Sequence, residues 1–123
     1  MSLKVGVIGC GNISEIYLKN LGGFDDVEVA AVADSDPERA RARAQQFRIS
    51  GALTVEALLA EPDIEIVLNL TIPQAHFEIA MAVLEAGKNV YNEKPLAVAR
   101  EDARKILNFA TERALRVGCA PDT

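Results

Sequence analysis

The fold of this chain is decided by residues 3–14, LKVGVIGCGNIS. The first six of these residues form a short apolar run that predicts a buried β-strand, and the two glycines after it open a helical segment. A second apolar run, Val27 to Ala33, follows and ends on Asp34. Strand, glycine turn, helix, strand and acid in this order are typical of the first unit of a dinucleotide-binding fold.

Each position of the glycine turn has a physical reason. Gly9 permits a tight turn out of the strand, and Gly11 lets the backbone approach a pyrophosphate that a Cβ would strike. The backbone N–H groups of Asn12 and Ile13 open the helix, whose positive end favours phosphate. Ser14 replaces the third glycine of the motif, and its small side chain is a tolerable change at a helix–strand packing position.

The acid at the end of the second strand lies 20 residues after Ser14 (34 − 14). At that spacing we expect Asp34 to accept hydrogen bonds from the adenine ribose hydroxyls. Ser35 and Asp36 follow it and offer no cation to a 2′-phosphate, so the sequence favours NAD over NADP, with Arg39 as the one nearby cation that could reverse this preference. The alternative is that Asp34 is only a solvated strand end and Ser35 a helix cap.

Composition narrows the class of protein. The 123 residues are 50% apolar and 25% charged, which is typical of one soluble globular domain. No apolar run reaches the ~18–20 residues of a membrane span, and the start of the chain leaves no room for a signal peptide. A net charge of −5 gives no footprint for nucleic acid. We therefore expect a cytoplasmic protein with neither a membrane nor a nucleic acid as partner.

Two cysteines complete this picture. Cys10 and Cys119 belong to no CxxC pair and have no histidine at metal-ligand spacing, so no metal site is expected. They end the first and last predicted strands, which are not neighbours, and two free thiols fit a reducing compartment. Cys10 fits a small turn residue better than a nucleophile, although its place at a helix start could lower its pKa and make it sensitive to oxidation.

The rest of the chain alternates between strand-like runs and helix-periodic segments. Strands are predicted at 51–53, 64–70, 89–91 and 116–119, and helices at 37–48, 55–60, 74–86 and 101–114. The last helix is predicted to face inward with Ala103, Ile106, Leu107, Ala110 and Ala114. Such alternation predicts an α/β Rossmann fold: a doubly wound, six-stranded parallel sheet of order 3-2-1-4-5-6.

Four motifs carry a resemblance over essentially the whole chain. They are Gly9–Ser14, Ala33-Asp34 with Pro37–Ala40, Thr71–His76, and Gly87–Leu96 with its Glu93-Lys94-Pro95 signature. On these motifs the chain resembles the N-terminal NAD-binding domain of the glucose–fructose oxidoreductase, inositol dehydrogenase and rhizopine-catabolism (Gfo/Idh/MocA) superfamily. Without the resemblance, Glu-Lys-Pro would read as an ordinary exposed turn.

The resemblance implies roles for the Glu-Lys-Pro turn. Lys94 would lie beside the nicotinamide, touching the cofactor ribose or a substrate hydroxyl, and act as a catalytic residue. A cation there would help to lower the pKa of a bound alcohol. Pro95 would hold the turn with a cis peptide bond, as is typical of this family. Glu93 would belong to the cofactor site by orienting Lys94 or capping backbone groups.

The resemblance also places the turn after the predicted strand 64–70. Thr71, Ile72 and Pro73 would line the cofactor cleft at the switch point of the sheet. The family often has Asn where this chain has Gln74, which leaves no side-chain role to carry over. His76 has a pKa suited to proton transfer, but we expect it to pack the start of the next helix, since the catalytic histidine of the family lies elsewhere.

Relatives in this family are longer and carry a second domain with the substrate pocket, the acid–base pair and most of the oligomer interface. We therefore expect a Rossmann domain over residues 1–120 and, at 121–123, the start of a connection to a substrate domain absent from the chain. The expected function is the cofactor-binding domain of an NAD(P)-dependent oxidoreductase for a sugar, polyol or related hydroxy compound, homo-oligomeric through the missing domain. Alone it would bind NAD(H) without turnover.

Two alternatives stay open at this point. One is a dinucleotide-binding regulatory module, similar to a co-repressor of this superfamily, without redox catalysis. The other is a related chemistry, such as imine or biliverdin-type reduction or NAD-assisted glycoside cleavage, which shares this half of the enzyme.

Overall fold

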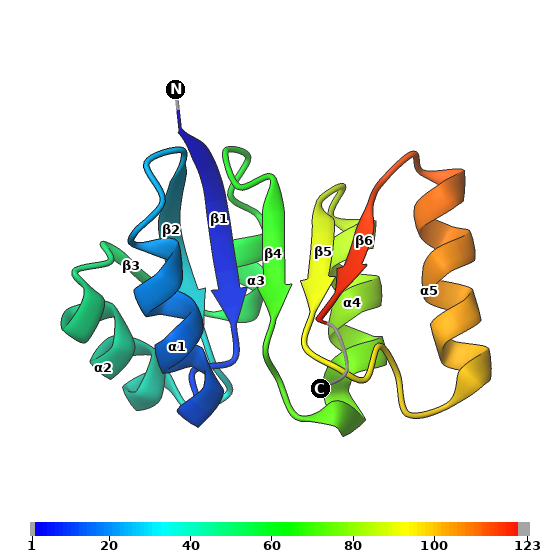
Figure 1. The fold of residues 1–123 in the computed structure, drawn as a ribbon, viewed down its shortest axis with the longest axis horizontal. Coiled ribbons are helices and arrows are strands. Elements are labelled where there is room, and N and C mark those ends of the chain that lie inside the picture. The colour runs from blue at the N-terminus through cyan, green and yellow to red at the C-terminus, as the bar shows by residue number, and fades with distance from the viewer. Residues whose placement is uncertain (1, 121–123) are drawn as a thin grey trace.

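The computed structural model describes residues 2–120 as one parallel sheet with helices on both sides (Figure 1). The six strands lie in the order β3-β2-β1-β4-β5-β6, and every neighbouring pair is parallel. In chain order the elements are β1 (Leu3–Ile8), α1 (Asn12–Leu21), β2 (Val27–Ala33), α2 (Pro37–Phe47), β3 (Gly51–Leu53), α3 (Val55–Leu59), β4 (Ile66–Asn69), the 3-10 helix η1 (Pro73–Ala75), α4 (His76–Glu85), β5 (Asn89–Asn92), α5 (Arg100–Glu112) and β6 (Val117–Cys119). The predicted Rossmann fold and strand order are confirmed.

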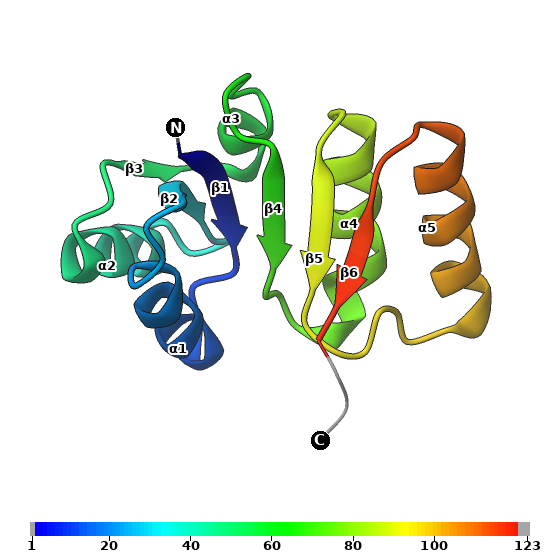
Figure 2. The same cartoon turned by 45° about the horizontal axis from the view of Figure 1, so that its top comes forward.

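The sheet is covered by two different sets of helices. In Figures 1 and 2, α1 and α2 lie on one face over the β1–β2–β3 half, and α4 lies behind the other half. The first face packs Leu18 of α1 on Val7 and Val32, whereas the second packs α3, α4 and α5 on residues such as Val67. Neighbouring residues of a strand therefore enter different cores, as the twofold alternation of β-strands requires.

The register of the strands aligns their carboxyl ends. Ile8 pairs with Ala33 on one side and with Asn69 on the other, and Asn69 in turn pairs with Asn92. Asn92 pairs with Cys119 at the end of β6. The segments after β1, β2, β4 and β5 therefore emerge at one edge of the sheet, the lower edge in Figure 1. Ligands bind at this edge in open α/β folds.

Local signals set the helix boundaries. Asp36 caps α2, since its Oδ1 accepts a hydrogen bond from the Glu38 N–H at 3.0 Å, and Pro37 occupies the first turn as predicted. The helix predicted at 74–86 begins instead with η1, where the Ala75 N–H donates to the Ile72 carbonyl at 2.9 Å. It ends before Gly87, which has a φ of +81°.

The face that α5 turns inward differs from the prediction. Ile106 and Ala110, four residues apart, are buried, whereas Leu107 is 49% exposed. Ala114 lies beyond the end of the helix with a φ of +56°, and Phe109 packs against the core in its place. Because α5 lies at the edge of the sheet, only a narrow stripe of its surface contacts the core. The predicted inward face was therefore too wide.

Two expectations from composition can be compared with the structure. Both cysteines are free thiols, with Cys10 buried and Cys119 exposed. Cys10 lies two residues after the end of β1, and Cys119 is the last residue of β6. These two strands are not neighbours in the sheet. Within the described range 2–120, no helix has the length and apolar character needed to cross a membrane.

The stripe on α5 can be tested with a matched pair of substitutions. We expect Ile106→Ala to lower the free energy of unfolding by about 2–5 kcal/mol, since it removes buried methyl groups from a packed core. Leu107→Ala, one position away, should change it by less than about 0.5 kcal/mol because the side chain is exposed. Urea denaturation followed by circular dichroism measures both, and equal losses would contradict the observed orientation of the helix.

Candidate functional site

A cleft of about 370 Å³ lies at the aligned strand ends, between the segments that follow β1, β2 and β4. Its lining contains five of the residues predicted to bind a cofactor: Gly9, Gly11, Asp34, Thr71 and Ile72. Val55 and Ile79 add apolar surface that the sequence analysis did not assign to the site. Their positions could have indicated this, because each lies near the start of a helix that begins at this edge of the sheet.

The two glycines are required for different reasons. Gly9 has a φ of +107°, and a Cβ there would lie 2.6 Å from the carbonyl carbon of Leu70, so the protein's own packing demands glycine. A Cβ on Gly11 would meet no atom within 4 Å. Gly11 therefore keeps space clear in the cleft, which fits the close approach of a pyrophosphate. Ser14 is buried and donates from Oγ to the Gly11 carbonyl at 2.6 Å, which accommodates the missing third glycine.

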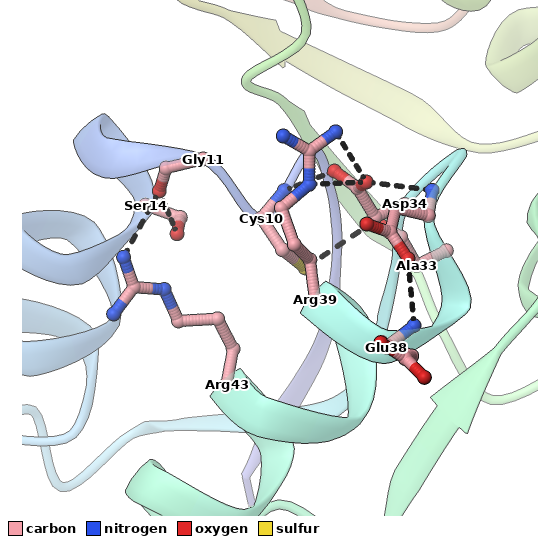
Figure 3. A network of polar contacts seen from close by, with 9 residues as sticks. Cys10, Gly11, Ser14, Ala33, Asp34, Glu38, Arg39 and Arg43 are labelled. Atoms are coloured by element: carbon pink, nitrogen blue, oxygen red, sulfur yellow. Dashed lines mark hydrogen bonds and ion pairs between the residues drawn. The ribbon is translucent and has the colours of Figure 1, made fainter.

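Asp34 is held at the centre of a hydrogen-bond network (Figure 3). Its Oδ1 accepts from the Cys10 N–H at 2.8 Å, and its Oδ2 accepts from the Asp36 N–H at 2.8 Å and from Arg39 Nε at 3.0 Å. The side chain is only 7% exposed, so the alternative of a solvated strand end is wrong. Oδ1 accepts only one of these hydrogen bonds. Because a carboxylate oxygen can accept two, Oδ1 can accept one more.

The charge of Asp34 follows from these contacts. Burial acts to raise the pKa of the carboxyl, but the backbone N–H groups of Cys10 and Asp36 and the guanidinium of Arg39 outweigh it and hold the pKa below its usual value. Asp34 is therefore ionised at neutral pH and acts purely as an acceptor. This is the form that can bind the hydroxyl groups of a ribose.

Arg43 is a second cation beside the glycine turn. Its Nη2 donates to the Gly11 carbonyl at 3.3 Å, and its Nη1 lies 3.4 Å from Oε2 of Glu15. Arg39 and Arg43 lie one helical turn apart on α2 (Figure 3). Both line a hollow that also contains Asn12. Only Arg39 was predicted as a nearby cation, and the i, i+4 spacing on a single helix was the signal for Arg43.

The Glu93-Lys94-Pro95 turn follows β5 at the same edge but lies outside the lining of the cleft. The Glu93 N–H donates to the Asn69 carbonyl at 3.0 Å, and its carboxylate accepts from the hydroxyl of Tyr17 on α1. The Lys94 side chain is exposed, and the Lys94–Pro95 peptide bond is cis, as expected.

Three other predicted residues, Asn12, Ile13 and Pro73, also lie outside the cleft lining, and Asn12 lines the hollow beside Arg39 and Arg43. Ile13 is 44% exposed in the first turn of α1, and Pro73 begins η1 after the turn from β4. Both remain at the edge where the strands end, next to Asn12 and Ile72 respectively.

A buried polar network joins the turn after β4 to the Glu93-Lys94-Pro95 turn after β5. Asn69 donates from Nδ2 to Asn92 Oδ1 at 2.8 Å and to the His76 carbonyl at 3.0 Å, and its Oδ1 accepts from Thr71 Oγ1 at 2.6 Å. The imidazole of His76, which is fully buried, lies between two carbonyl oxygens: Nε2 is 2.8 Å from that of Thr71, and Nδ1 contacts that of Pro95. These bonds support the expected structural role for His76. Neither asparagine was predicted, although each is a polar residue that ends a strand.

Cys10 is buried in the turn, and the lower pKa that its place at a helix start could give is not found. Burial, followed by the negative charge of Asp34, raises the pKa of the thiol to about 11, and the charges of Arg43 and Arg39 offset this only in part. Burial therefore outweighs the helix start, and Cys10 is a protonated thiol at neutral pH. Within residues 2–120, no three histidine, cysteine or acidic side chains are grouped as metal ligands.

The fold and the site together define a class. A glycine turn opens a helix with free N–H groups, and a buried ionised carboxylate ends the adjacent strand at the switch point of a doubly wound sheet. This arrangement is that of a dinucleotide-binding Rossmann domain.

Comparison with known proteins gives the particular family. The profile described as "Oxidoreductase family, NAD-binding Rossmann fold" of the Gfo/Idh/MocA group matches residues 3–120. The chain therefore belongs to the Gfo/Idh/MocA oxidoreductase family and comprises its NAD(P)-binding domain.

Three relatives illustrate the likeness. The D-xylose 1-dehydrogenase (NADP(+)) of Hypocrea jecorina is 37% identical over 93% of this chain and 32% of its own length. The inositol 2-dehydrogenase of Salmonella paratyphi B is 32% identical over 95% of this chain and 36% of its own length. The crystal structure of GenD2 from gentamicin A biosynthesis, in complex with NAD, superimposes with a TM-score of 0.92 at 28% identity, over 97% of this chain and 34% of GenD2. The chain thus spans about a third of the length of these relatives.

The two glycines make a first test of the site. Gly11→Ala should alter the free energy of unfolding by less than about 1 kcal/mol, since the added Cβ meets open space. It should nevertheless weaken NADH binding at least about tenfold, because the added methyl group occupies space that the ligand needs. Gly9→Ala should instead destabilise the fold by about 1–3 kcal/mol. Urea denaturation and calorimetric titration with NADH separate the two effects. Unchanged binding by Gly11→Ala would contradict the role of the turn.

Thiol reactivity tests the environment of Cys10. In the native protein at pH 8 we expect Ellman's reagent to modify only Cys119, which is exposed, because Cys10 is buried and protonated. Both thiols should react in denaturant. The control Cys119→Ser should abolish the native reaction, and rapid native modification of Cys10 in that variant would contradict the raised pKa.

Proposed function

We propose that this chain is the cofactor-binding part of an NAD-dependent dehydrogenase that acts on a sugar, a polyol or a related hydroxy compound. The observation that carries the proposal is Asp34, a buried ionised carboxylate at the end of β2 that faces the cleft beside the glycine turn. Such a group accepts hydrogen bonds from the two adenine ribose hydroxyls of NAD.

The other groups of the cleft suit the remainder of a dinucleotide. The open space at Gly11 and the N–H groups of Asn12 and Ile13 at the start of α1 suit the pyrophosphate. The cleft continues to Thr71 and Ile72 after β4, with Pro73 fixing the exit of that turn. A dinucleotide crosses from one half of such a sheet to the other at this switch point, which brings its nicotinamide half toward β4 and β5.

The charges beside Asp34 support NAD rather than NADP. A 2′-phosphate would meet the carboxylate of Asp34 and the nearby acids Asp36 and Glu38. The guanidinium of Arg39 already forms an ion pair with Asp34, at 3.0 Å, so its charge is largely balanced. Among the relatives, the xylose dehydrogenase is named for NADP(+) and GenD2 was crystallised with NAD, so the residues of this chain are the better guide.

Lys94 is proposed as the catalytic residue. The cofactor supplies hydride transfer when it is bound, and the alcohol that gives up the hydride must also lose a proton. A cation beside that hydroxyl stabilises the developing alkoxide. The exposed Lys94 side chain, in the turn after β5, suits this role, and Glu93 fixes the turn through its contacts with β4 and α1.

The substrate class rests on the relatives. D-xylose and inositol, the substrates named for two of them, are both polyhydroxylated. A hydroxyl-bearing carbon that can be oxidised to a carbonyl is the feature they share.

The proposal is tested by titrating the chain with NADH and NADPH in a calorimeter. The unsubstituted chain should bind NADH more tightly. Asp34→Ala should weaken NADH binding about tenfold to a hundredfold, since it removes hydrogen bonds to a charged acceptor. The same substitution should leave NADPH binding unchanged or strengthen it, because a repulsive charge is gone.

The control is Asp25→Ala, which removes an exposed acid from the turn between α1 and β2. It should bind both nucleotides as the unsubstituted chain does. Because Asp34 also holds the glycine turn, unfolding would reduce the affinity for both nucleotides together. Tighter binding of NADPH than of NADH by the unsubstituted chain would overturn the assignment of Asp34.

A further inference from the structure

One hydrogen bond joins the helix after the glycine turn to the turn that carries Lys94. The hydroxyl of Tyr17 on α1 donates to Oε2 of Glu93, 76 residues further along the chain. We infer that Tyr17 is a positioning residue that fixes the Glu93-Lys94-Pro95 turn against α1 and so strengthens binding of the nicotinamide half of the cofactor. This inference rests on the proposed function.

The fold holds Tyr17 in place for this contact. Tyr17 lies three residues after Ser14 and one before Leu18, the two buried residues of α1, so helical periodicity turns it toward the sheet. Its ring is partly buried against the core that contains Leu68, against which Tyr91 of β5 also packs. A ring packed in this way presents its hydroxyl at one position, and the bond to Glu93 costs little further conformational entropy.

The acceptor is fixed from the other side. The Glu93 backbone continues the ladder between β5 and β4 through its bond to the Asn69 carbonyl. Burial, then the hydrogen bond and charge of Glu93, raise the pKa of Tyr17, and the same carboxylate, after burial, raises the pKa of Cys119. The phenol therefore remains protonated at neutral pH and acts as the donor.

The contacts of Tyr17 are separate from those that build the adenosine half. Asp34 is held by Cys10, Asp36 and Arg39, whereas the far side of the Glu-Lys-Pro turn is held by His76 at the Pro95 carbonyl. Removing the hydroxyl of Tyr17 releases the carboxylate of Glu93 and leaves those contacts intact. The effect should therefore be confined to the nicotinamide half.

The test is Tyr17→Phe, titrated with NADH and with ADP, which keeps the adenosine and pyrophosphate but lacks both the nicotinamide and the ribose that carries it. We expect the Kd for NADH to rise about fivefold, which is part of the contribution of a hydrogen bond to a charged group, and the Kd for ADP to stay within about twofold. Tyr91→Phe, the matched removal of the other tyrosine hydroxyl, should change neither. Thermal denaturation of both variants checks the fold.

A double-mutant cycle tests whether Tyr17 acts through Glu93. Glu93→Ala should show the same selective loss of NADH affinity, and adding Tyr17→Phe to it should have little further effect. Equal losses for NADH and ADP, additive losses in the double variant, or no loss at all would overturn the inference. If Tyr17→Phe does not fold, Glu93→Ala still tests the inference. The absence of a selective loss of NADH affinity in Glu93→Ala would then be enough to overturn it.

The proposed function fails in a different way. An unsubstituted chain that binds neither NADH nor ADP would overturn the dinucleotide assignment and this inference with it. An unsubstituted chain that binds both, together with a Tyr17→Phe variant that behaves identically, would overturn only the inference.

Discussion

The site depends on the register of the parallel sheet. The residue that follows each of three strands donates its N–H to the last residue of the neighbouring strand: Gly9 to Ala33, Leu70 to Ile8, and Glu93 to Asn69. These bonds, of 2.8 to 3.0 Å, extend the ladder past the strand ends. The glycine turn, the turn after β4 and the Glu-Lys-Pro turn therefore leave the sheet at one level. A slip of one residue would turn every side chain of a strand to the other face and separate these turns.

Within that frame, Asp34 stabilises the fold and, in the proposed function, also binds the ligand. Its Oδ1 fixes the backbone of Cys10, and its Oδ2 fixes the start of α2 through Asp36 and Arg39. The same contacts lower its pKa and keep it charged in a largely buried place. The carboxylate that suits a ribose is thus already desolvated and oriented before a ligand arrives, which reduces the reorganisation that binding requires.

How far the sequence predicts the structure depends on the distance over which each signal acts. The strand order and the place of Asp34 follow from local patterns: apolar runs, glycines and the spacing of one βαβ unit. The contact between Tyr17 and Glu93 has no such pattern, because it depends on how far one side chain reaches across the sheet. The raised pKa of Cys10 could not be predicted from the sequence for a related reason. The helix start is visible in the sequence, whereas the burial that outweighs it arises from tertiary packing.

The two halves of the site are therefore stabilised in different ways. The proposed adenosine half is built by one contiguous stretch, from β1 to α2, and its shape is fixed largely by backbone donors and by glycine conformation. The proposed nicotinamide half joins three distant segments through the side chains of Tyr17, Asn69 and His76. Backbone contacts survive most substitutions, but a contact made by a side chain is lost when that one residue changes. Variation in sequence should thus alter the nicotinamide half more readily while the dinucleotide fold itself persists.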